Sequence, residues 1–207
     1  MRTLIALPCM DSVATPFFNS FIHLRMKGEA AALIYQGTLI YEARNKMAMT
    51  AVRDGFDYVL WLDSDMIFEP DTLERMLDSI GDNDLLSGLY FTRKEPIKPC
   101  IFKTCSTEVK DGLVIPDCKP YLDYPKNSKF QIAGCGFGTV LTKVSMLNGL
   151  IEKTGMPFAP VYGFGEDLAF CLRANQFGYK LACDSSIKAG HVMQIISNEE
   201  LYLRKGK

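Results

Sequence analysis

Apolar residues in the first half of the chain follow two alternating patterns: short continuous runs, and longer stretches with helical spacing. The continuous run Tyr58–Leu62 is typical of a parallel strand buried on both faces. The stretch that begins at Pro16 and stops at Gly28 has the spacing of a helix. Further strands are predicted at Thr3–Leu7, Ala31–Tyr35 and Leu85–Phe91, and further helices at Leu39–Val52 and Pro70–Ile80. This alternation predicts an α/β domain with a mostly parallel central sheet flanked by helices.

The pattern changes between Arg93 and Lys129, where five prolines, many lysines and short apolar patches predict loops and hairpins inserted beside the sheet. After this segment the alternation resumes. Strands are predicted at Phe130–Ala133, Gly138–Leu141, Tyr179–Cys183 and Ile187–Val192, and helices at Val144–Glu152, Glu166–Phe177 and from Asn198.

Length and charge narrow the possible classes of protein. The 207 residues predict a single domain, and a net charge of −1 argues against a sequence-independent nucleic-acid binder. No apolar run approaches the roughly 20 residues that span a bilayer. The seven cysteines are scattered, odd in number and contain no Cys-x-x-Cys pair, which indicates reduced thiols in a cytoplasmic protein.

Cys100, Cys105 and Cys118 fall within one short region, so a structural zinc site is an alternative for them. Their spacing fits no standard zinc pattern, and whether they bind a metal stays open.

Asp63-Ser64-Asp65 comes directly after the buried run. Side chains two apart on an extended segment point the same way, so the two carboxylates converge where the strand ends. Such a pair suits a hard divalent cation that also contacts phosphates. The simpler alternative is a solvated turn that precedes a helix.

Three further groups of residues are candidates for the site. Glu166 and Asp167 follow a glycine pair and open a helix, and a carboxylate there suits a general base, although acids also stabilise helix N-termini. His191 ends a predicted strand and could complete a metal shell with Asp65. Arg44 interrupts an apolar helical stretch and could contact a nucleotide phosphate or orient the acidic pair. His23, in contrast, is interpreted as structural.

Taken in order, these pieces resemble a GT-A-fold glycosyltransferase of the family 2-like group. The resemblance runs from Thr3 to about Val192 and rests on six segments: the first strand ending in Pro8, Ala43-Arg44-Asn45, Leu62–Met66, Gly134–Val140, Gly165–Arg173 and Gly190-His191.

The resemblance implies a nucleotide-sugar donor, a UDP-sugar in most members, and a divalent metal, Mn²⁺ or Mg²⁺. It implies that Asp63 contacts the donor ribose or reaches the metal through water, while Asp65 and His191 ligate the metal. Asp167, with Glu166 beside it, matches the catalytic base of inverting members. Pro8, Asp11, Arg44 and Ser64 are implied to bind the donor.

The resemblance also implies how the single domain, residues 1–207, divides by function. Residues 1–92 are expected to form the nucleotide-binding half and residues 93–207 the acceptor-side half. The first loop is Cys9-Met10-Asp11 rather than the family's common Thr-Tyr-Asn type, so the choice of nucleotide is open. The acceptor, whether a glycan, a protein, a small molecule or a modified nucleic acid, is open too.

Two other functions compete with a metal-dependent glycosyltransferase. A nucleotidyltransferase also uses paired carboxylates and metal, but it is expected to carry a glycine- and lysine-rich phosphate loop, and Pro8–Pro16 contains neither residue type. A non-catalytic carbohydrate-binding relative is the other alternative, because a fold does not guarantee an activity.

Overall fold

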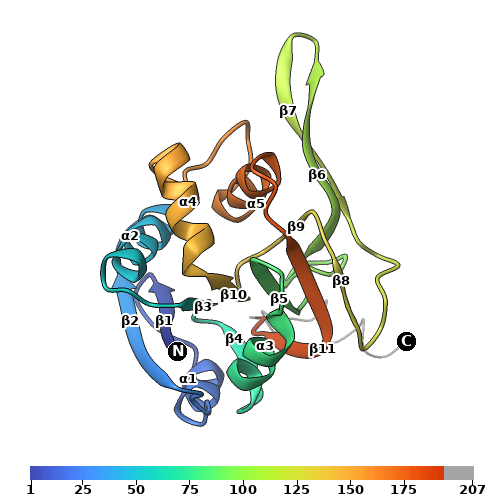
Figure 1. Ribbon diagram of the computed structural model, residues 1–207. Helices are drawn as coiled ribbons and strands as arrows, with labels where there is room; N and C mark the ends of the chain where they lie inside the picture. Colours follow the sequence, from blue (N-terminus) through green and yellow to red (C-terminus); the bar gives the residue numbers. More distant parts are fainter. Residues whose placement is uncertain (194–207) are drawn as a thin grey trace, which may run out of the picture.

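The computed structural model describes residues 1–193, in which a mixed sheet separates two layers of helices (Figure 1). The strand order is β2-β1-β3-β10-β5-β11-β4. The strands that run in one direction are β1 (Arg2–Cys9), β2 (Glu29–Gln36), β3 (Tyr58–Leu62), β5 (Leu85–Leu89) and β11 (Leu181–His191). The predicted α/β class with a mostly parallel sheet is therefore confirmed.

Three strands run the other way. β10 (Thr139–Lys143) lies between β3 and β5, and β4 (Met66–Phe68) and β8 (Lys129–Gln131) pair with β11. β10 is buried along most of its length because it occupies the centre of the sheet. The sheet thus interleaves strands from both parts of the chain.

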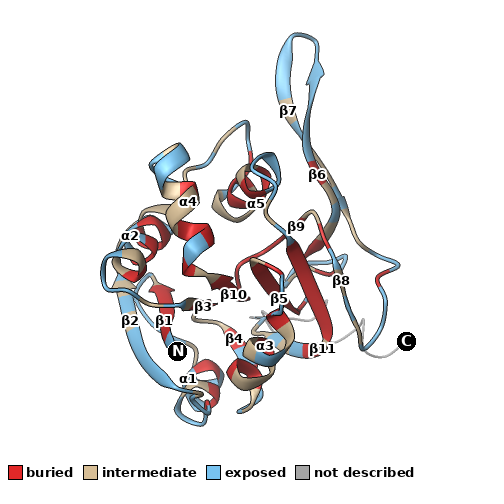
Figure 2. Cartoon of the chain, viewed as in Figure 1, coloured by how far each residue is buried: buried red, intermediate tan, exposed pale blue. Residues whose placement is uncertain are grey.

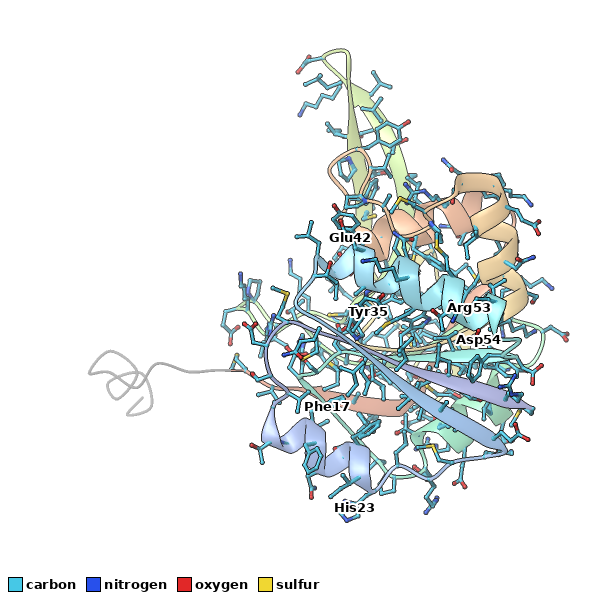
Figure 3. The ribbon with its side chains drawn as sticks, turned by 90° about the vertical axis from the view of Figure 1, so that its left-hand side faces the viewer. Phe17, His23, Tyr35, Glu42, Arg53 and Asp54 are labelled. Atoms are coloured by element: carbon cyan, nitrogen blue, oxygen red, sulfur yellow. The ribbon has the colours of Figure 1, made fainter. Side chains whose placement is uncertain are left out.

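Helices cover both faces of the sheet. One face carries α2 (Ile40–Arg53), α4 (Val144–Thr154) and α5 (Glu166–Gln176), and the other carries α1 (Thr15–Ile22) and α3 (Thr72–Ile80). Figure 3 shows β1 and β2 between α2, marked by Glu42 and Arg53, and α1, marked by Phe17. Each face has its own apolar cluster, so the sheet is buried on both sides, as the continuous apolar run in β3 predicts.

The last part of the sheet differs from the prediction. Tyr179–Cys183 and Ile187–Val192 were predicted as two strands, but β11 is one strand with an irregular register between Asp184 and Lys188. The intervening polar residues break the apolar pattern, although Asp184 accepts hydrogen bonds from Ser79 and Ser186 within the fold. The predicted helix from Asn198 lies outside the described residues.

The hairpin predicted within Arg93–Lys129 is present. β6 (Ile101–Lys110) and β7 (Leu113–Pro120) form a ribbon that projects from the body of the molecule and is joined to it through β9 (Gly134–Cys135) (Figure 1). Asp111 and Gly112 both have positive φ, as a tight hairpin turn requires. Most of the ribbon is exposed, in contrast to the sheet (Figure 2).

The cysteines form no disulfide among the described residues, which include all seven. Cys105 faces Cys118 across the hairpin, whereas Cys100 lies close to Tyr90. Within residues 1–193 no three His, Cys, Asp or Glu side chains form a group that could hold a metal ion, so the fold does not gather these three cysteines into a zinc site. No helix in the same residues is long and apolar enough to cross a membrane.

Candidate active site

A cavity of about 880 Å³ opens where the parallel strands end. This is the edge at which open α/β sheets bind ligands, and the volume is that of an ordinary ligand pocket. The predicted site residues all line it: Pro8, Asp11, Arg44, Asp63, Ser64, Asp65, Glu166, Asp167 and His191. The structure therefore brings together residues that are up to 183 positions apart in the chain.

The backbone after β3 is fixed by hydrogen bonds on both sides. The amide of Asp63 donates to the carbonyl of Gly138 over 3.1 Å, and the amide of Ala14 donates to the carbonyl of Ser64 over 3.0 Å. These bonds tie the acidic segment to the loop after β9 and to the start of α1. The carboxylates therefore project from a constrained turn.

Asp65 and His191 meet because β4 pairs with the end of β11. His191 is aligned with Met66, and the amide of Val192 donates to the carbonyl of Asp65 over 2.9 Å. Asp65 Oδ2 and His191 Nε2 lie 3.3 Å apart. Hydrogen bonding to Asp65 raises the pKa of His191. Burial acts to raise the pKa of Asp65, but the bond to His191 and the charges of His191 and Arg93 hold this pKa below its ordinary value.

This pair offers two potential metal ligands. His191 Nδ1 lies 2.9 Å from the carbonyl oxygen of Phe91, so Nδ1 carries the hydrogen that it donates there. The other ring nitrogen, Nε2, is then left with a lone pair once its proton is lost, and this arrangement is usual for histidine ligands of metals. A carboxylate oxygen and an imidazole nitrogen thus lie side by side in the cavity as two potential ligands of a divalent cation.

Arg44 joins the two acidic motifs of the site. Its side chain is only 2% exposed, donates from Nη2 to Asp63 Oδ1 over 2.8 Å, and places Nε 3.6 Å from Glu166 Oε1. The guanidinium also lies 5.2 Å from the ring centre of Phe137. Nε and Nη1 have no hydrogen-bond partner in the described part of the chain. The geometry supports the predicted role of orienting the acidic pair.

Asp167 lies in the first turn of α5, where its Oδ1 accepts the amide hydrogen of Leu168 over 2.7 Å. Burial, and then the neighbouring charge of Glu166, raise the pKa of Asp167 to about 6. A carboxyl group with a pKa near neutrality can exchange a proton at working pH, as a general base must.

Gly136 and Gly138, in the glycine cluster at the floor of the cavity, leave space for neighbouring side chains. A Cβ atom on Gly136 would lie 2.1 Å from the hydroxyl of Tyr90 and 3.5 Å from Asp167 Oδ2, and a Cβ on Gly138 would lie 2.9 Å from the sulfur of Met66. The amide of Gly138 donates to the Tyr90 hydroxyl over 3.1 Å. These glycines therefore allow close packing beside Asp167.

Sequence reasoning missed several residues that line the cavity. Tyr90 is buried beside the glycine cluster, and its ring packs edge-on against His191 at 5.7 Å. Arg93 forms an ion pair with Asp65, and Lys94 and Lys98 line the cavity from the same loop. The signal for them was weak, because the loop was marked only by its lysines and prolines. His23 is exposed at the end of α1, as Figure 3 shows.

Part of the chain is similar in sequence to a known protein family. Residues 36–104, which include Arg44 and the Asp63–Asp65 segment, match the model of the family described as Glycosyl transferase family 2. No curated protein matches the chain by sequence.

Two solved structures share the fold. The crystal structure of A197 from STIV has a TM-score of 0.65 at 21% identity, over 94% of this chain and 87% of that one. The crystal structure of GalNAc-T7 with UDP, GalNAc and Mn²⁺ has a TM-score of 0.59 at 10% identity, over 94% of this chain but only 43% of that one.

The chain has the GT-A fold. The sequence match falls on the segment that carries the first acidic motif and its arginine. This segment is similar to family 2 glycosyltransferases, and over most of its length the chain resembles the two solved structures in fold.

Proposed function

We propose that the protein transfers a sugar from a nucleotide-diphosphate donor, a UDP-sugar, to an acceptor hydroxyl with inversion, and that it depends on a divalent metal. The observation that carries this proposal is the convergence of the Asp65–His191 pair, the Arg44-linked acids and Asp167 in one cavity. The structural neighbour solved with UDP and Mn²⁺ supports the choice of donor and metal.

The donor binds at the strand ends. Pro8, Asp11 and Ser64 line the cavity where the nucleotide is expected, and Asp63 faces the ribose or the metal through water. Arg44 holds Asp63 in position, and its positive charge beside the cavity favours an anionic ligand such as the donor diphosphate.

Asp65 and His191 would hold the metal, Mn²⁺ or Mg²⁺. When bound, such a cation neutralises the charge that develops on the leaving diphosphate. Two protein ligands leave positions for water and phosphate oxygens, so metal and donor are expected to bind together.

Asp167 acts as the base. As the acceptor oxygen attacks the anomeric carbon, its proton passes to Asp167, and the bond from that carbon to the diphosphate breaks with its electron pair leaving on the diphosphate. A positioned base of this kind contributes roughly 10²–10⁴-fold in rate. Glu166 is paired with Arg44, and its negative charge contributes to the raised pKa of Asp167.

The remaining parts of the proposal concern the surroundings of the site. Residues 1–92 mainly serve the nucleotide and residues 93–207 mainly the acceptor, with His191 and the loop 93–98 of the second half facing the donor. The acceptor is a glycan, a protein, a small molecule or a modified nucleic acid. A cytoplasmic location accords with the unpaired cysteines.

A nucleotide-release screen tests the function. The protein is incubated with UDP-, GDP- and TDP-sugars and Mn²⁺, and released nucleotide diphosphate is measured for wild type and Asp65→Ala. The proposal predicts release of UDP that the variant loses. Release of pyrophosphate would instead indicate a nucleotidyltransferase, and sugar-nucleotide binding without any release would indicate a non-catalytic relative.

A further inference from the structure

Arg93 contacts the same carboxylate that is expected to hold the metal. Its Nη1 donates to Asp65 Oδ2, the oxygen that lies 3.3 Å from His191 Nε2. One carboxylate oxygen therefore faces two nitrogen atoms, one from the guanidinium and one from the imidazole. The charge of Asp65 is already balanced by a cation from the protein.

A divalent ion held by Asp65 and His191 would compete with Arg93. The ion would need Asp65 Oδ2, and a guanidinium on the same oxygen would repel it. Metal binding thus requires Arg93 to leave Asp65, so the ion pair opposes binding of the metal by itself.

The loop that carries Arg93 is suited to such a movement. Residues 93–98 are all exposed, and the loop is closed by local bonds, including that from the Thr92 amide to the Lys98 carbonyl over 2.8 Å. The Arg93 side chain is itself 55% exposed, and exposed ion pairs are weak. In contrast, Phe91, at the root of the loop, holds His191 through its carbonyl oxygen, so the side chain of Arg93 can leave while the histidine stays in place.

We propose that Arg93 is an exchange cation that pairs with Asp65 when the site holds no metal and moves to the donor diphosphate when metal and nucleotide bind. This inference rests on the proposed function. The diphosphate would lie against the metal, next to Asp65, and a guanidinium matches phosphate oxygens with two parallel hydrogen bonds. Lys94 and Lys98 line the cavity from the same loop and add positive charge on that side.

If Arg93 makes this exchange, removing its side chain should change the affinities for Mn²⁺ and for UDP in opposite directions. In Arg93→Ala, calorimetry should show Mn²⁺ alone binding roughly 3–10-fold more tightly, because its competitor is gone. UDP binding at saturating Mn²⁺ should weaken by roughly tenfold, because a phosphate contact is lost. Lys94→Ala is the matched control, since it removes a charge from the same loop without touching Asp65. It should leave the affinity for Mn²⁺ alone unchanged.

Each remaining outcome overturns the exchange. Weaker UDP binding with unchanged Mn²⁺ affinity would make Arg93 a phosphate ligand only, and tighter Mn²⁺ binding with unchanged UDP affinity would make it a counter-ion only. An equal gain in Mn²⁺ affinity in Lys94→Ala would show that the loss of any positive charge near the site causes the effect. Failure of the proposed function is distinguishable, because wild type would then bind no UDP with Mn²⁺, or Asp65→Ala would bind both as wild type does.

Discussion

The floor and the outer wall of the cavity are built in opposite ways. In the floor, charged groups are held by buried structure, as Arg44 is between Asp63 and Glu166. The wall consists of the exposed loop 93–98 and the base of the β6–β7 hairpin, whose hydrogen bonds are mostly local. The groups proposed for chemistry are therefore preorganised, whereas the groups beside donor and acceptor are free to adjust.

Hydrogen exchange tests this contrast directly and should show the largest effect. β3 is buried and pairs with strands on both sides, so its amides should exchange only on global unfolding. Amides in the exposed loop 93–98 of the wall should exchange about 10³–10⁶-fold faster, because opening there costs little. Equal protection of both segments would show that the wall is as rigid as the floor.

Asp167→Asn removes the proposed base and keeps its shape. Turnover should fall about 10²–10⁴-fold with little change in donor affinity, the pattern of a lost transition-state interaction. Turnover and UDP affinity are measured on the same preparation. Near-normal turnover in the folded variant would exclude Asp167 as the base and direct attention to Glu166→Gln.

Arg44→Met removes the cation that joins the acids of the floor. The free energy of unfolding should fall by about 2–4 kcal/mol, because Asp63 and Glu166 are left partly buried without their partner. Urea unfolding measures this change. Arg53→Met is the matched control on the same helix (Figure 3). Arg53 is exposed and, among residues 1–193, pairs only with its neighbour Asp54, so stability should stay nearly unchanged. Equal effects would contradict a special role for Arg44.

The pH dependence of the floor follows from Asp167. The base must be deprotonated, so kcat/KM should rise through a pKa of about 6, falling about tenfold per pH unit below it. The raised pKa also means that the fold favours the protonated form, so this group's contribution to stability is present below its ordinary pKa and is lost as the pH rises through about 6. Asp167→Asn should therefore raise the melting temperature at pH 8 but not at pH 4. A variant that melts lower at pH 8 would contradict this account of the charge.

The sequence predicted the floor better than the wall. Asp63, Asp65, Asp167 and His191 could be found because each follows a strand or opens a helix whose apolar pattern is plain. Ligands bind at the carboxyl ends of parallel strands, and this rule predicts that most of these residues lie in one site.

The rest depends on contacts that no local pattern encodes. The antiparallel position of β10 and the short strand β4 were missed, and β4 is what aligns Met66 with His191. Arg93 was missed for the same reason, because its partner Asp65 is 28 positions away and the loop between them carries no periodic signal.

The most direct test of the central claim is calorimetry of Mn²⁺ with and without UDP. We expect Mn²⁺ to bind wild type at least about tenfold more tightly when UDP is present, because Asp65 and His191 leave most of the coordination shell to phosphate and water. Asp65→Ala should lose this enhancement. Equal affinity without UDP, or unchanged affinity in Asp65→Ala, would contradict a nucleotide-linked metal site at Asp65 and His191.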